Sequence, residues 1–189
     1  MPNKIKPWKV IKSKVIHKTS WNEIIEDTCL SNYTEFKYTY TKRIDEGPLI
    51  IAEENNGSIW LVQQYRHPIK KIIWQLPADG KLPHESWLEA AKRGLKEELQ
   101  LEAKKWVNLG QYFTDPGGLE QKYQLYLATG LVQNDERSTV VNNDDTEILQ
   151  IKNFSRAEID RMIKSGDICD NWTLAGLYLL DRYRVKNSL

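Results

Sequence analysis

The chain has 189 residues, 40% hydrophobic and 28% charged, which is typical of one soluble globular domain with an ordinary core. A formal net charge of +1 gives no electrostatic basis for binding nucleic acid or a membrane surface, so neither is expected as a partner. No signal-peptide or membrane-spanning run is present, and the two distant cysteines fit a reducing compartment, so we expect a cytoplasmic protein.

The first part of the chain is predicted to be rich in β-structure. Residues 8–16 mix apolar and basic side chains and indicate an extended segment. Residues 23–30 and 33–43 flank a short polar turn, and aromatic residues alternate with polar ones in the second, which predicts a hairpin. The alternative is a short helix opened by a capping box of Ser20 and Glu23.

A second hairpin and a helix follow. Residues 48–54 and 58–66 flank the sequence Asn-Asn-Gly, a strong hairpin turn. Residues 71–77 predict a strand that ends at a proline, and a helix is expected from about residue 84 to residue 99. Its apolar stripe has helical spacing and consists of Leu88, Ala91, Leu95 and Leu99.

The remaining elements complete a mixed fold. Strands are expected near 105–113, 122–129 and 147–154, and the polar segment 133–146 is ambiguous. Ser155 and Glu158 form a capping box that predicts a helix, and a longer helix closes the chain. Because strands and helices do not alternate regularly, we expect an α/β (α+β) fold, in which helices cover a mixed β-sheet.

The helix over residues 84–99 has a charged face. Glu85, Glu89, Arg93 and Glu97 are four residues apart, and Glu98 lies beside them. This pattern is also typical of an ordinary solvated helix face. The preceding turn contains two prolines and a glycine, however, and carboxylates gathered near such a turn suit a hard cation such as Mg²⁺.

One residue of this helix is unexpected. Gly94 stands among strong helix formers, although an interior glycine costs on the order of 1 kcal/mol relative to alanine.

The spacing of these residues resembles the Nudix hydrolase family, whose box reads G-x5-E-x7-R-E-U-x-E-E-x-G-U, where U is aliphatic. The matching positions are Glu85, Arg93, Leu95, Glu97, Glu98 and Leu101. Three positions depart from the box: Asp79 and Gln100 replace its two glycines, and Gly94 replaces the first glutamate after the arginine. Gly80 is a candidate for the turn glycine, one step late.

The resemblance covers residues 45–185 and is similar to the ADP-ribose pyrophosphatases in particular. It includes the sequence Gln-Tyr-Arg before the box, the sequence Leu-Pro-Ala-Asp-Gly at its start, and Pro116 after it. The resemblance implies a Nudix-type mixed sheet sandwiched between helices in residues 46–189. It also implies that residues 1–45 are a β extension that forms a homodimer.

The resemblance implies hydrolysis of a nucleoside diphosphate linked to another group, such as ADP-ribose or a nucleotide sugar, with Mg²⁺ or Mn²⁺ as cofactor. Glu97 and Glu98 would hold the cation with the backbone carbonyl of Ala78, and Arg93 would orient the carboxylates.

Further roles are implied outside the box. Glu147 or Asp145, from a late acidic loop, would position the water or bind metal. Arg66 would contact a substrate phosphate, and Trp74 is a candidate for stacking on a base.

Gly94 removes one carboxylate that the family uses as a metal ligand. Glu120 and Glu89 are candidates to replace it. Two hypotheses therefore stand: a working or weakened hydrolase, and a catalytically inactive Nudix domain that binds a nucleotide diphosphate or a partner.

Overall fold

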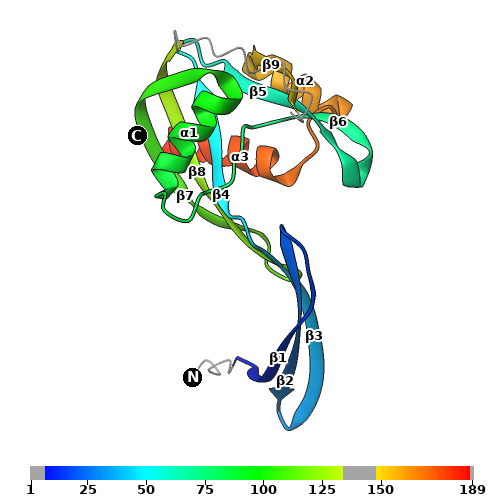
Figure 1. Ribbon diagram of the computed structural model, residues 1–189. Helices are drawn as coiled ribbons and strands as arrows, with labels where there is room; N and C mark the ends of the chain where they lie inside the picture. The colour runs from blue at the N-terminus through cyan, green and yellow to red at the C-terminus, as the bar shows by residue number, and fades with distance from the viewer. Residues whose placement is uncertain (1–6, 134–147, 188–189) are drawn as a thin grey trace. The chain divides into compact units, whose positions relative to one another are not determined.

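The structure is a computed structural model that describes residues 7–133 and 148–187. The chain forms two compact units (Figure 1). The first consists of the described part of Met1–Glu46 together with Phe113–Lys122. The second consists of the described parts of Gly47–Tyr112 and Tyr123–Leu189.

The first unit is a small antiparallel sheet. Strands β1 (Lys9–Lys18), β2 (Asn22–Ser31) and β3 (Thr34–Arg43) pair in sequence order. The turn between β2 and β3 uses Asn32 and Tyr33, both with positive φ. The predicted hairpin is therefore confirmed, and the alternative short helix is wrong because the segment pairs along its whole length with β3.

The second unit contains β4 (Gly47–Glu53), β5 (Ile59–Arg66), a 3₁₀ turn (His67–Ile69), β6 (Lys71–Gln75) and β9 (Ile148–Phe154). Two long strands, β7 (Leu101–Asp115) and β8 (Leu119–Gln133), contribute to both units and extend beyond their predicted ranges. β4 is parallel to β8, whereas β5 is antiparallel to β4, β6 and β9. The sheet is thus mixed, as predicted.

The described residues of the second unit form three α-helices: α1 (Trp87–Leu99), α2 (Arg156–Ser165) and α3 (Asn171–Asn187). None of the helices in the described residues is long and apolar enough to cross a membrane. Both cysteines are free thiols.

The helices cover both faces of the sheet, which confirms the predicted fold class. Successive side chains of a strand point to opposite faces, and β4 is buried on both. Leu49 and Ile51 pack in one core cluster with residues of α2 and α3, such as Leu180. Ile50 packs in a second cluster with Leu95 of α1. Figure 1 shows α1 and α3 on opposite sides of β4.

Helix α1 begins three residues later than predicted because a serine caps it. The Ser86 side chain accepts a hydrogen bond from the Glu89 N–H, and the Glu89 carboxylate accepts one from the Ser86 N–H. The helix ends at Leu99, and the next residue, Gln100, caps it in a left-handed conformation.

Candidate active site

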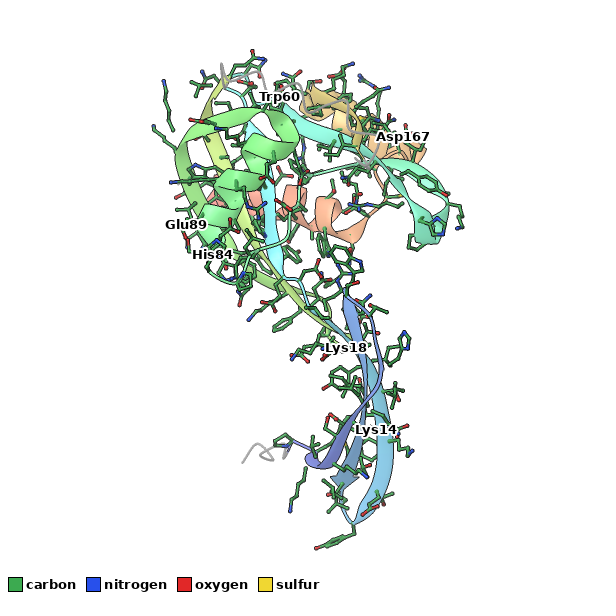
Figure 2. The ribbon with its side chains drawn as sticks, viewed as in Figure 1. Lys14, Lys18, Trp60, His84, Glu89 and Asp167 are labelled. Carbon is green, nitrogen blue, oxygen red and sulfur yellow. The ribbon has the colours of Figure 1, made fainter. Side chains whose placement is uncertain are left out.

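The candidate site is built on the loop between β6 and α1 and on the exposed face of α1. Figure 2 labels His84 of this loop and Glu89 in the first turn of α1. The loop returns to the sheet, since the Ile50 N–H donates to the Pro77 carbonyl and Ala78 forms an isolated bridge with Leu49. Because β4 packs against α1, this backbone contact holds the loop beside the helix.

Arg93 is the centre of the site. Its guanidinium donates to both carboxylate oxygens of Glu85, at 2.8 and 3.1 Å, and to Glu97 at 2.9 Å. It also donates to Asp79 and, at 2.6 Å, to the Gly80 carbonyl. One side chain from α1 therefore holds three carboxylates and the loop backbone, which is the geometry that suits a guanidinium fork.

The charges of this network shift the pKa values of its members. The hydrogen bond from Arg93 holds the pKa of Glu85 down at about 2, and the Leu82 N–H adds to this effect. Glu85 is therefore ionised at any physiological pH and permanently available to Arg93.

Glu98 differs from the other acids because its carboxyl group points inward. Its Oε2 atom is enclosed and has no hydrogen-bond partner among the described residues. The pKa of Glu98 is raised to about 8, first by burial and then by the negative charge of Asp79, and a hydrogen bond from the Ala78 backbone N–H opposes this shift. A buried carboxyl oxygen without a partner is a site for a cation or a ligand hydrogen bond.

Arg66, at the end of β5, lies near this carboxyl group. Its positive charge lowers the pKa of Glu98, and its Nε donates to the Gln75 side chain at 2.5 Å. Arg66, which was predicted from the sequence to contact a phosphate, therefore lies close to Glu98 of α1.

Gly94 is buried, and the loop explains why it is a glycine. A Cβ atom at this position would lie 2.9 Å from the Asp79 Cβ, closer than real Cβ atoms approach. It would lie 3.6 Å from both Asp79 Oδ2 and Ile50 Cδ1. The helix therefore has no side chain here because the Asp79 side chain from the loop fills the space.

Sequence reasoning missed this contact between Asp79 and Gly94. The signal was present in two departures from the box: a carboxylate stands where the family has a glycine, and a glycine stands where the family has a carboxylate. When the departures at positions 79 and 94 are considered separately, each is a loss of a family residue, and the box therefore looks degenerate.

The structure leaves the predicted roles of Trp74, Asp145 and Glu147 untested. Trp74 packs edge-on against Phe154, with ring centroids 4.8 Å apart, and its role in stacking stays a prediction. The acids predicted for the late loop, Asp145 and Glu147, both lie outside the described residues.

The two candidates to replace the missing carboxylate have other roles. Glu89 caps α1, and Glu120 belongs to the first unit, where it pairs with Lys42 at 3.6 Å.

The donor chemistry of the site fits a divalent cation. Carboxylates from Asp79, Glu97 and Glu98 and the Ala78 carbonyl are hard oxygen donors of the kind that Mg²⁺ and Mn²⁺ prefer. Within residues 7–133 and 148–187, no set of three acidic, histidine or cysteine side chains already converges as metal ligands. Arg93 instead holds Asp79 and Glu97, while the enclosed Glu98 oxygen has no hydrogen-bond partner.

The site is an acidic face of α1 that Arg93 fixes to the loop after β6, and its oxygen donors define it as a candidate divalent-cation site. Comparison with known proteins gives the family. The NUDIX domain matches residues 46–170, which is more than half of the chain, so the chain belongs to the Nudix family.

Three characterised relatives are similar in sequence. An ADP-ribose pyrophosphatase of Mycobacterium tuberculosis is 33% identical over 133 residues, covering 68% of this chain and 61% of the relative. An ADP-ribose pyrophosphatase of Bacillus subtilis is 26% identical, covering 74% of this chain and 72% of the relative. A methanol dehydrogenase activator of Bacillus methanolicus is 31% identical, covering 69% of each chain.

A solved structure described as an ADP compounds hydrolase has the same fold. It superposes with a TM-score of 0.83 over 97% of both chains, at 17% sequence identity. The chain is thus a member of the Nudix family, and it is similar in sequence to two ADP-ribose pyrophosphatases, of which it spans 61% and 72% of the length.

Proposed function

We propose that the protein hydrolyses the pyrophosphate bond of ADP-ribose or a similar nucleoside diphosphate conjugate, with Mg²⁺ or Mn²⁺ as cofactor. The observation that carries this proposal is the Arg93 network, which holds Glu85, Asp79 and Glu97 beside the enclosed Glu98 oxygen. The sequence relatives that are ADP-ribose pyrophosphatases support the choice of substrate class.

The proposed reaction breaks one P–O bond of the pyrophosphate. Water attacks one phosphorus, the bridging oxygen leaves with the other phosphate, and ADP-ribose yields AMP and ribose 5-phosphate. A bound divalent cation would neutralise charge on the phosphate oxygens and lower the pKa of the attacking water.

The protein residues would bind and orient the reactants. Glu97, Glu98 and the Ala78 carbonyl would hold the cation, and Arg93 would keep Glu97 in position while remaining tied to Glu85. Arg66 would contact a phosphate through its planar guanidinium. Glu147, or Asp145 in its place, would bind metal or position the attacking water.

A substrate screen tests the proposal. The full chain is incubated with ADP-ribose, nucleotide sugars or dinucleotide polyphosphates, with Mg²⁺ or with EDTA, and products are separated by chromatography. We expect turnover of ADP-ribose that EDTA abolishes and that Glu98→Gln lowers about a hundredfold or more.

Asp181→Asn is the matched control for the loss of one carboxylate. Asp181 of α3 pairs with Arg156 of α2, so the variant breaks an ion pair with an arginine but changes no residue of the candidate site. Its turnover should equal that of the wild type. If the wild type binds nucleotides in calorimetry but hydrolyses none of the substrates, the inactive-domain hypothesis is correct and the proposed activity is wrong.

We also propose that the first unit forms a homodimer. All ten residues of β1 are exposed, and β1 pairs with β2 alone among the described strands. Its Val10, Ile11, Val15 and Ile16 are each between 45% and 51% exposed. An exposed apolar edge strand is a surface for a partner chain.

Light scattering on a sizing column tests this part. The wild type should have the mass of a dimer, and Val15→Lys with Ile16→Lys should shift it to a monomer because the lysines resist strand pairing. A monomeric wild type at micromolar concentration would rule out the dimer.

A further inference from the structure

The contact between Asp79 and Gly94 concerns the chemistry of the site as well as its packing. Asp79 Oδ2 lies 3.6 Å from the position of a Cβ on residue 94. A glutamate in an extended rotamer places its own carboxylate oxygens about as far from its Cβ. The Asp79 carboxylate therefore lies within the space that a glutamate side chain at position 94 would reach.

The neighbours of this carboxylate are the other acids of the site. Residues 94, 97 and 98 are at i, i+3 and i+4 and share one face of α1. Arg93 bonds to Asp79 and Glu97 with the same nitrogen, which brings these two carboxylates together. Glu98 is one helical turn from Gly94, the position that the Asp79 side chain covers.

The enclosed oxygen of Glu98 is an independent sign of a ligand. It has no hydrogen-bond partner among the described residues, and it belongs to the helix face that also contains Gly94 and Glu97. A cation placed among the three carboxylates would give this oxygen a partner.

We propose that Asp79 is the third carboxylate ligand of the divalent-cation site, supplied from the loop across Gly94 instead of from the helix. This inference rests on the proposed function, since it assigns a ligand to the same cation. Asp79 and Gly94 form one unit: the aspartate brings the charge, and the glycine gives it room. The departures from the Nudix box at these two positions thus compensate each other, and the box is rearranged rather than degenerate.

Titration calorimetry with MnCl₂ alone, without nucleotide, tests the inference. Asp79→Asn keeps the size of the side chain and an oxygen that can accept from Arg93, but it removes the charge. We expect the Kd for Mn²⁺ to rise about tenfold or more in Asp79→Asn. The control Asp181→Asn, which removes the charge of one of the two acids paired with Arg156, should leave the Kd unchanged.

A structural role for Asp79 predicts a different result. If Asp79 only supports Arg93, Asp79→Asn lowers the melting temperature but binds Mn²⁺ like the wild type, and this outcome overturns the inference. Circular dichroism on the same samples measures the melting temperature.

A second set of variants keeps the test decisive if Asp79→Asn folds poorly. Asp79→Gly removes the carboxylate from the loop, and Asp79→Gly with Gly94→Glu returns it to the helix. In the double variant the new Cβ would no longer meet the Asp79 side chain and would keep the ordinary 3.6 Å contact with Ile50. We expect the double variant to bind Mn²⁺ within about threefold of the wild type, and Asp79→Gly alone to bind about tenfold more weakly.

The two proposals fail in distinguishable ways. If Asp79→Gly binds Mn²⁺ as tightly as the wild type, residue 79 is not a ligand, and the inference alone is wrong; if only the double variant fails to recover binding, positions 79 and 94 do not compensate each other. If the wild type neither binds Mn²⁺ nor hydrolyses any substrate, the proposed function fails and the inference fails with it. Gly94→Glu alone should melt at a lower temperature, because its Cβ meets the Asp79 side chain.

Discussion

Helices α1 and α2 have similar ends but different interiors. Each begins with a Ser-x-x-Glu capping box and ends in a left-handed residue, Gln100 in α1 and Gly166 in α2. α2 has no interior glycine, whereas α1 contains Gly94 because a side chain of the preceding loop occupies the space. The ends of a helix thus follow from its own sequence, but the residue in its middle can depend on a neighbour far along the chain.

The largest difference between the two helices is expected in how much their arginines, Arg93 and Arg156, contribute to the free energy of unfolding. Arg93→Met removes a side chain that is 25% exposed and bonded to three carboxylates, so we expect a loss of about 2–3 kcal/mol in the free energy of unfolding. Arg156→Met breaks more exposed pairs with Asp160 and Asp181 and should cost less than about 1 kcal/mol. Urea unfolding measures both, and equal losses would contradict the central role of Arg93.

The effect of Gly94→Ala on stability should change sign when Asp79 is replaced by glycine. In the wild type, Gly94→Ala should destabilise the protein by about 1–2 kcal/mol, because the new Cβ is 2.9 Å from the Asp79 Cβ. In an Asp79→Gly background the same change should stabilise the protein by about 0.5–1 kcal/mol, through helix propensity.

A double-mutant cycle from urea unfolding gives the coupling between the two positions. If Gly94→Ala has the same effect in both backgrounds, Asp79 is not the reason for the glycine.

The two capping serines should matter equally for stability but not for activity. Ser86→Ala and Ser155→Ala each remove an N-cap and should each cost about 1 kcal/mol. Only Ser86 caps the helix that carries Glu97 and Glu98, so only Ser86→Ala should also lower the rate of hydrolysis. Urea unfolding and an initial-rate assay on both variants check this, and a rate loss in Ser155→Ala would contradict it.

The smallest expected effect is a dependence of stability on pH. The folded-state pKa of Glu85 is about 2, below its ordinary value of 4.5, mainly because Arg93 donates to it. Its contribution to stability is therefore present above about pH 4.5 and is lost as the pH falls towards 2.

Glu85→Gln should accordingly weaken the fall in stability over this acid range. Urea midpoints at pH 6 and pH 3 measure the difference, with Glu89→Gln as a comparison in the same segment. An unchanged difference between the two midpoints would show that the carboxylate of Glu85 does not titrate as described.

Much of the fold was predictable because its signals are local. The turn at residues 55–57, the capping box at Ser155 and the apolar stripe of α1 each depend on residues within a few positions of one another. The start of α1 was missed by three residues, because Ser86 and Glu89 form the true cap. The strands β7 and β8 were predicted too short, since pairing between them and with other strands extends them beyond their own sequence pattern.

The candidate site was only partly predictable. The spacing of Glu85, Arg93 and Glu97 places them on one helix face, and the structure joins all three by hydrogen bonds. The inward orientation of Glu98 could not be derived from spacing, because it depends on where the Ala78 backbone lies. The proximity of Arg66 likewise depends on the pairing of β5 with the rest of the sheet.

The sequence by itself determined the family and the fold class, and it placed the acids and the arginine of α1 on one helix face because that placement depends on short-range spacing. The tertiary structure alone decided the meaning of Gly94. Residues 79 and 94 are separated by a loop and two turns of helix, and only the return of that loop to β4 brings the Asp79 side chain over the glycine. In the sequence, Gly94 looks like the loss of a carboxylate from the helix. In the structure, it leaves the space that the Asp79 side chain occupies.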